Sequence, residues 1–164
     1  MATAPLDPVT PINIATVRKL LANTTDASVV RKLVTSDATY VSLNFENANL
    51  HKIMPWCGTH TASGPQGIIE TFENVDRHWE NKDFTIQGIF GDEANVAVFG
   101  SFTYMARVTQ KTVTSPFAIW CRFDWEGKIN FMQFMEDTFM TASSFEVSGV
   151  KTYHADPDGR EVRM

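Results

Sequence analysis

The sequence predicts one α+β domain, with helices laid on one face of a curved antiparallel sheet. Two observations support this class: apolar residues recur at helical spacing in the first half, and four β-rich runs joined by short turns fill the second. The 164 residues suit one domain, and 43% hydrophobic with 20% charged residues allows a substantial core. The 12 Phe, 4 Trp and 3 Tyr rings must pack in a core, an interface or a cavity.

The elements follow in order along the chain. Residues 1–11 contain three prolines and predict an extended lead-in. Apolar spacing and helix-start residues predict three helices, at 12–22, at about 24–35, and from 63–65 onward, where a proline suits the first turn. The β-rich runs predict strands at 37–44, 84–90, 96–108, 112–125 and 128–145. Residues 45–62 contain bulky rings without a period and predict a loop, and 150–164 predict a polar tail with at most a short hairpin.

Charge and composition argue against several classes of protein. The 14 basic residues against 19 acidic ones give a formal charge of −5, so we expect no nucleic-acid partner. No apolar run approaches the ~20 residues of a membrane helix, and the N-terminus lacks the pattern of a secretory signal. We therefore expect a cytoplasmic protein with no membrane partner. Cys57 and Cys121 lie far apart and form no paired motif, which favours two reduced thiols and no metal site.

Three segments carry a family resemblance: LVTSDATYVSL at 33–43, GTHTASGPQGIIETF at 58–72 and GKINFMQFMEDT at 127–138. Together with the element order, they resemble the SnoaL-like branch of the nuclear transport factor 2-like superfamily, which includes polyketide cyclases, ketosteroid isomerases and limonene epoxide hydrolases. The resemblance implies a cone-shaped sheet packed against three helices with a central pocket, a domain spanning 12–149, and no cofactor. It also implies a homodimer formed through the outer face of the sheet.

Asp137 is the leading candidate for a catalytic residue. It lies eight residues after Ile129, where the cyclases and epoxide hydrolases of this family carry an acid–base aspartate. Strand alternation places Phe131, Gln133 and Met135 on the same face as Asp137, and an apolar pocket would raise the pKa of its carboxyl. The alternative is a structural role, in which Asp137 accepts hydrogen bonds from a backbone turn or pairs with an arginine. Glu136 is expected to point the opposite way, as a solvated or interface charge.

Further candidates surround the expected pocket. His60 lies in the loop predicted over its mouth, where it could shuttle a proton or be an ordinary exposed histidine. Tyr40, Ser42 and Asn44 share one face of the first predicted strand and would offer hydroxyl and amide groups to a ligand if that face is concave. The apolar lining is expected to come from Trp56, Phe72, Trp79, Phe117, Ile119 and Met135.

Two functions from different classes remain open. The first is a cofactor-independent cyclase, isomerase or hydrolase that acts on a small hydrophobic, oxygenated molecule through Asp137, with Tyr40 or His60 stabilising developing charge. Ser42 stands where ketosteroid isomerases place their base, and Arg122 and Asp124 lie at the wrong depth for an epoxide hydrolase relay. Because the isomerase base and the complete hydrolase relay are missing, the second function is favoured: a non-catalytic ligand-binding or protein-interaction domain. Strand parity predicts that Phe131 faces inward and Phe134 outward, towards a second subunit.

Overall fold

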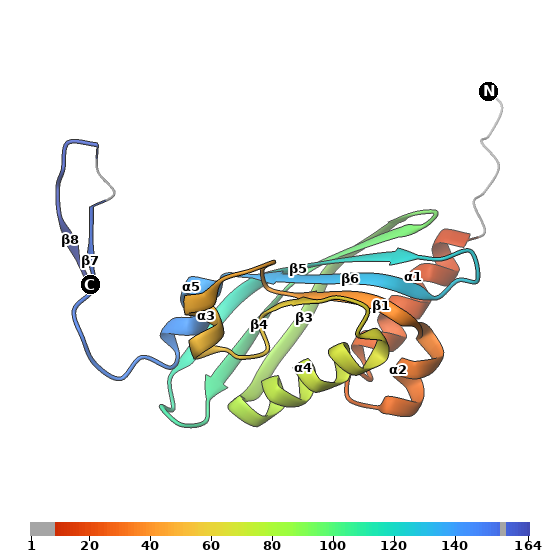
Figure 1. Ribbon diagram of the computed structural model, residues 1–164, viewed down its shortest axis with the longest axis horizontal. Coiled ribbons are helices and arrows are strands. Elements are labelled where there is room, and N and C mark those ends of the chain that lie inside the picture. The colour runs from red at the N-terminus through yellow and green to blue at the C-terminus, as the bar shows by residue number, and fades with distance from the viewer. Residues whose placement is uncertain (1–8, 155–156) are drawn as a thin grey trace.

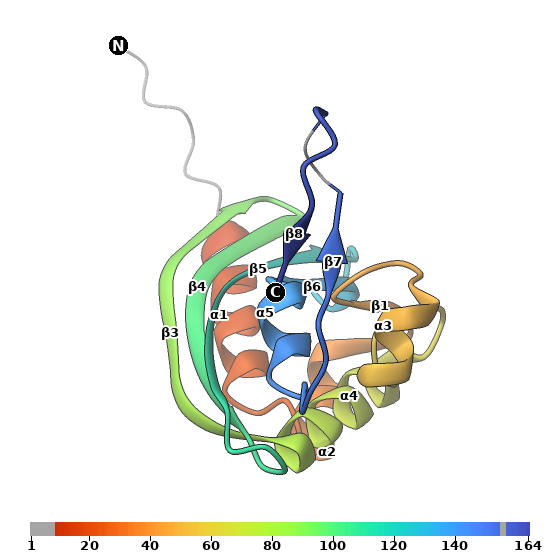
Figure 2. The same ribbon diagram turned by 90° about the vertical axis from the view of Figure 1, so that its left-hand side faces the viewer.

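Six strands form one bent sheet whose concave face is covered by helices in the computed structural model, which describes residues 9–154 and 157–164 (Figures 1 and 2). The strand order is β2-β1-β6-β5-β4-β3. The strands of this sheet are β1 Val34–Ser42, β2 Gly58–His60, β3 Trp79–Asp92, β4 Asn95–Ala106, β5 Thr112–Phe123 and β6 Ile129–Glu136. The helices are α1 Val9–Leu21, α2 Ala27–Leu33, α3 Ala48–Ile53, α4 Gly64–His78 and α5 Thr138–Ser143. The predicted α+β class is therefore confirmed.

The sheet departs from the expected antiparallel arrangement in one pairing, because β1 runs parallel to β6. The other neighbouring strands of this sheet pair antiparallel. The core lies between the concave face and the helices, and its largest fully buried side chains include Tyr40, Phe102, Leu20, Met54, Ile68 and Ile119. Tyr40 lies on β1, which pairs with β2 along one edge and with β6 along the other.

Capping decides where the helices begin. The extended lead-in predicted for residues 1–11 overlaps α1, which begins at Val9. Residues 1–8 of this lead-in lie outside the described part of the chain. In α2 the N-cap is Asp26, whose carboxylate accepts hydrogen bonds from the amides of Ser28 and Val29 at 2.9 and 3.2 Å. A proline in the first turn of α4 begins that helix where the sequence predicts it.

Two predicted segments are wrong in detail because short capped helices interrupt them. Residues 45–62, predicted as a loop, contain α3 and β2, and the Asn47 side chain caps α3. The predicted strand 128–145 ends at Glu136, since Asp137 becomes the N-cap of α5 and its carboxylate accepts the amide of Met140 at 3.1 Å. Helices of six residues are too short to show a clear apolar period.

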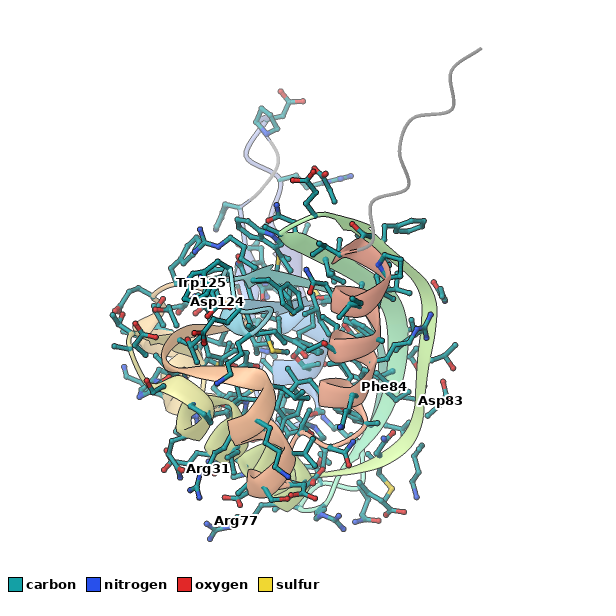
Figure 3. The ribbon with its side chains drawn as sticks, turned by 90° about the vertical axis from the view of Figure 1, so that its right-hand side faces the viewer. Arg31, Arg77, Asp83, Phe84, Asp124 and Trp125 are labelled. Atoms are coloured by element: carbon teal, nitrogen blue, oxygen red, sulfur yellow. The ribbon has the colours of Figure 1, made fainter. Side chains whose placement is uncertain are left out.

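Side chains of β4 and β5 alternate between the two faces of the sheet along their whole length. Figure 3 shows the same alternation on β3, where Phe84 lies on the inner side and Asp83 on the outer. The inner ring of Phe84 stacks on Phe117 with 4.6 Å between centroids. Beside this stack a Cβ on Gly100 would lie 2.2 Å from the carbonyl oxygen of Thr85, so the close approach of β3 and β4 requires glycine.

A β-bulge in β6 decides which of its side chains face inward. Arg122 pairs with Phe131 and Phe123 pairs with Ile129, so Asn130 is an extra residue without a partner on β5. One extra residue moves every later side chain to the opposite face. The inward side chains beyond the bulge are Met132, Phe134 and Glu136.

The parity predicted for β6 is therefore wrong. Phe134 is 5% exposed and packs edge-to-face on Phe72, whereas Phe131 is half-buried on the outer face beneath Arg122. The prediction takes Asp137 as the inward residue, and strand alternation then turns Phe131 inward and Phe134 outward, the reverse of the observed arrangement.

After α5 the chain leaves the sheet and forms a small hairpin of β7 Thr152–Tyr153 and β8 Val162–Arg163, set apart from the domain (Figure 1). This hairpin lies in the segment predicted as a polar tail, 150–164.

Candidate functional site

An inner cavity lies between the concave face of the sheet and α4. Its walls come from β1, α4, the start of β3, β4, β6 and the segment before β2. The lining residues are Tyr40, Ser42, Leu43, Trp56, Thr71, Phe72, Val75, Trp79, Tyr104, Phe134 and Glu136. Its free volume is about 20 Å³, which is close to the space of one water molecule. The cavity is therefore nearly closed in this conformation.

Glu136 is the acid of this inner cavity, and the sequence prediction placed it on the opposite face. The residue keeps partial exposure: it lines the inner cavity with Tyr40, Tyr104 and Phe134, and it also borders an open surface hollow together with Met135 and Asp137. Burial raises the pKa of Glu136 from its ordinary 4.5 to about 7, a hydrogen bond from the Thr141 side chain opposes the rise, and the nearby negative charge of Asp137 adds to it. A carboxyl of this kind exchanges a proton readily near neutral pH.

Hydroxyl groups lie around this carboxyl. Tyr40 and Ser42 are each 1% exposed, and both line the inner cavity. Burial raises the pKa of both Tyr40 and Tyr104 well above its usual range, and the Glu136 charge contributes to each rise. Both phenols therefore keep their protons and can donate hydrogen bonds to an oxygen that gains charge. Tyr40 and Ser42 face the inner cavity, which is the inward one of the two alternatives left open for this strand.

Asn44 and His60 do not line the inner cavity. The side-chain oxygen of Asn44 is buried and accepts no hydrogen bond from the described residues. His60 stacks on Tyr40 with 6.0 Å between centroids, and its Nε2 lies 2.8 Å from the carbonyl oxygen of Trp56. Because a carbonyl only accepts, this nitrogen carries the proton. His60 thus supports two lining residues and opens onto a separate surface hollow beside β2.

The structure places Asp137 outside the inner cavity. Its carboxylate is exposed and caps α5, and its backbone amide donates to the hydroxyl of Ser115 at 2.9 Å. These contacts match the structural role weighed from the sequence, with a helix end in place of a turn. The bulge at Asn130 is the physical reason, because it gives the inward position to Glu136.

The predicted apolar lining divides into three groups. Trp56, Phe72 and Trp79 line the inner cavity as expected. Phe117 and Ile119 are buried in the core and do not line it. The residues on the outer side of β6 are Phe131, Gln133 and Met135, again because of the bulge. The lining residues that sequence reasoning missed are Leu43, Thr71, Val75, Tyr104, Phe134 and Glu136. For the last two, the bulge that turns them inward leaves no local sequence signal.

Comparison with known proteins agrees with this architecture. A family described as the SnoaL-like domain matches residues 17–132. The chain belongs to the SnoaL-like domain family. Patulin synthesis protein F of Aspergillus clavatus is 50% identical over 135 residues, which are 82% of this chain and 68% of that protein.

Solved structures share the fold of this SnoaL-like domain at low identity. A nuclear transport factor 2-like protein from Burkholderia thailandensis superposes with a TM-score of 0.68 at 17% identity, covering 82% of this chain and 98% of that one. A protein described as a putative SnoaL-like polyketide cyclase from Jannaschia superposes with a TM-score of 0.66 at 16% identity, covering 88% and 100%. Such similarity shows the fold, while the chemistry depends on the residues of this chain.

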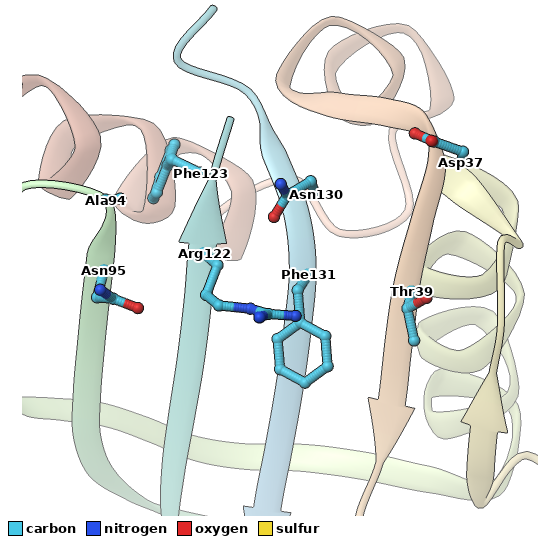
Figure 4. A pocket seen from close by; sticks show the side chains of 8 residues that line it. All are labelled: Asp37, Thr39, Ala94, Asn95, Arg122, Phe123, Asn130 and Phe131. Atoms are coloured by element: carbon cyan, nitrogen blue, oxygen red, sulfur yellow. The ribbon is translucent and has the colours of Figure 1, made fainter. Parts of the chain in front are cut away.

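A second, larger hollow of about 550 Å³ lies open to solvent on the outer face of the SnoaL-like domain (Figure 4). The bulge residue Asn130 forms part of its wall. The Arg122 guanidinium lies over the ring of Phe131 at 4.3 Å, and Trp120 beside it donates to the Asn95 side chain at 3.0 Å. This hollow has an exposed, mainly polar wall and lacks the enclosed acid of the inner cavity.

Within residues 9–154 and 157–164, histidine, cysteine and acidic side chains do not gather in threes that could hold a metal ion. None of the helices in these two ranges has the length and apolar character needed to cross a membrane.

Proposed function

We propose that this SnoaL-like domain is a biosynthetic enzyme that binds a small oxygenated molecule in the inner cavity and transfers a proton through Glu136. The observation that carries the proposal is an enclosed carboxyl with a pKa of about 7, set among aromatic rings and phenol hydroxyls. Two relatives are named patulin synthesis protein F and patulin biosynthesis cluster protein F, and these names support a place in a biosynthetic pathway.

The proposed step is an isomerisation or ring closure. The ionised Glu136 takes a proton from one atom of the substrate, and the resulting carboxylic acid returns it to another, so the step consumes no other reactant. Tyr40 and Tyr104 donate hydrogen bonds to the substrate oxygen that becomes negative in between. The aromatic walls bind the apolar part of the molecule.

The small free volume sets a condition on this proposal. Because about 20 Å³ holds little more than a water molecule, a substrate enters only when a wall of the inner cavity moves. The lining residues that keep partial exposure are Leu43, Phe72, Val75 and Glu136. A protein that only binds its ligand would also need such a wall movement, and non-catalytic binding is the alternative function.

The test uses a natural mixture in place of an unknown substrate. A small-molecule extract is prepared from an Aspergillus clavatus strain that lacks patulin synthesis protein F, so that its unconverted intermediate accumulates. We expect the purified domain to consume one component, as followed by liquid chromatography and mass spectrometry, and Glu136→Gln to bind that component without converting it. Binding without conversion by both proteins would support the non-catalytic reading, and conversion by both would remove Glu136 from the mechanism.

We also propose that a second copy of the chain covers the outer face of the sheet. Phe90, Phe99 and Trp120 are exposed there by 64, 48 and 39%, and the first two rings lie 6.3 Å apart. Neighbouring exposed rings of this kind favour an interface.

A further inference from the structure

A strained turn forms part of the wall of the inner cavity, directly after β1. The amide of Asn44 donates to the carbonyl oxygen of Ser42 at 2.8 Å, and Leu43 between them has a φ of 67°. A hydrogen bond across three residues with a positive φ at the centre is a γ-turn of the rare, strained kind. A bulky side chain seldom adopts such a φ, because its Cβ crowds the backbone. The turn therefore stores strain at Leu43, which lines the inner cavity.

Leu43 differs in its position from the other strained residues. Among the described residues other than glycine, three more have a positive φ: Ala62, Glu93 and Gln110. All three are exposed, and they do not line the inner cavity. At those positions the unusual φ shapes a surface turn, whereas at Leu43 it carries part of a closed wall.

The next residue adds a second cost to the closed turn. The side-chain oxygen of Asn44 is buried and accepts no hydrogen bond from the described residues. A buried acceptor without a donor is costly, because it has lost water and gained no partner. Movement of the turn that returns this oxygen to water removes that cost.

We propose that Leu43 is the gate of the inner cavity: the turn at residues 42–44 relaxes, and the Leu43 side chain leaves the wall so that a substrate can enter. The inference rests on the proposed function, which requires a wall of the nearly closed cavity to move. Opening breaks the hydrogen bond from Asn44 to Ser42 and lets Leu43 adopt the extended backbone that a bulky residue prefers.

The anchors of this segment confine the movement to Leu43 and Asn44. The Leu43 amide donates to the carbonyl oxygen of Phe134 at 2.9 Å, and rotation about φ, the next bond along the chain, leaves that hydrogen bond in place. Beyond the turn, the carbonyl oxygen of Phe45 accepts the Thr59 hydroxyl at 3.1 Å. The two residues between these anchors belong to neither a helix nor a strand.

The other partly exposed lining residues have firmer backbones. Phe72 and Val75 lie within α4, and Glu136 pairs with Phe117 of β5 in the sheet. Moving their backbones would break the hydrogen bonds of a helix or of a strand ladder. Opening at Leu43 breaks one hydrogen bond between near neighbours in the chain.

The experiment measures opening and needs no substrate. Thr71 lines the inner cavity and is 3% exposed, so the thiol of Thr71→Cys reacts with iodoacetamide only when the cavity opens. Mass spectrometry of the digested protein separates this probe thiol from the native Cys57 and Cys121. Cys121 is 0% exposed in the core, so its labelling reports unfolding of the whole domain.

The deciding variant is Leu43→Ile, made in the Thr71→Cys background. It keeps the number of carbon atoms and raises the strain, because a β-branched residue tolerates a positive φ least. We expect the probe thiol to react about tenfold faster, with Cys121 unchanged. The matched control is Leu50→Ile, which makes the same exchange in α3, where the backbone is helical, and should label like the parent.

A probe thiol that reacts at the parent rate in Leu43→Ile would overturn the inference, and so would an equal acceleration by Leu50→Ile. If Cys121 also reacts faster in Leu43→Ile, the decision passes to Asn44→Leu, which removes the buried oxygen at similar size. That variant must slow labelling of the probe thiol several-fold, and an unchanged rate there would overturn the gate. Each of these failures leaves the role of Glu136 untouched, whereas retained conversion in Glu136→Gln would end the proposed function whatever the labelling rates.

Discussion

The carboxyl of Glu136 makes the stability of the fold depend on pH, and Glu136→Gln should remove that dependence. Its pKa is about 7 in the folded cavity and 4.5 in an ordinary environment. Between these values the folded state keeps the proton that the unfolded chain has released. The contribution of Glu136 is therefore full below about pH 4.5 and is lost as the pH rises through 7.

The size of this effect follows from the same two values. Each pH unit between them corresponds to about 1.4 kcal/mol, so the interval from 4.5 to about 7 amounts to about 3 kcal/mol. We expect Glu136→Gln to match the parent at pH 4.5 and to exceed its free energy of unfolding by about 3 kcal/mol at pH 8. For a chain of this size, that difference raises the melting temperature by roughly 6–12 °C.

The assay is urea unfolding of both proteins at several pH values from 4.5 to 8. Glu73→Gln on the exposed side of α4 is the matched control, because it removes the same charge outside the inner cavity. A constant difference between Glu136→Gln and the parent across this range would refute the reasoning. It would mean that the carboxyl is solvated in the folded protein.

Three further predictions follow from other contacts. Asp137→Ala should lower the free energy of unfolding by about 1 kcal/mol, because α5 loses its N-cap. Asp137→Asn should keep the cap and the stability in the same urea assay, and equal losses in the two variants would contradict the capping role. Phe134→Ala should cost about 3–5 kcal/mol and Phe131→Ala much less, since only the first ring is in the core; the reverse order would restore the parity predicted from sequence. Trp120→Glu should shift the protein from dimer to monomer in light scattering, and a dimer that survives it would argue against the outer-face interface.

The sequence predicts much of the architecture because local signals and long-range structure agree over most of the chain. The proline after Gly64 begins α4, and alternation along β4 and β5 holds without interruption. Tyr40 and Ser42 face inward, one of the two orientations that the alternation of the first strand allows. The family resemblance implies a cone-shaped sheet and a central pocket, which spacing alone does not provide.

The catalytic candidate shows where sequence reasoning stops. Asn130 is an extra residue only in relation to Arg122 and Phe123 on the next strand, so the bulge is a property of strand pairing that the local sequence does not reveal. That one residue exchanges the positions of Glu136 and Asp137. The helix that Asp137 caps has six residues and no periodic signal, so the end of β6 was equally hidden.

The central claim is that Glu136, and not its neighbour, moves the proton. The most direct measurement compares turnover of the component consumed from the Aspergillus clavatus extract by Glu136→Gln and by Asp137→Asn. We predict a loss of about 10²–10⁴-fold for Glu136→Gln, the usual contribution of a general acid or base, and turnover within a few-fold of the parent for Asp137→Asn. Full turnover in Glu136→Gln together with a loss in Asp137→Asn would contradict the account.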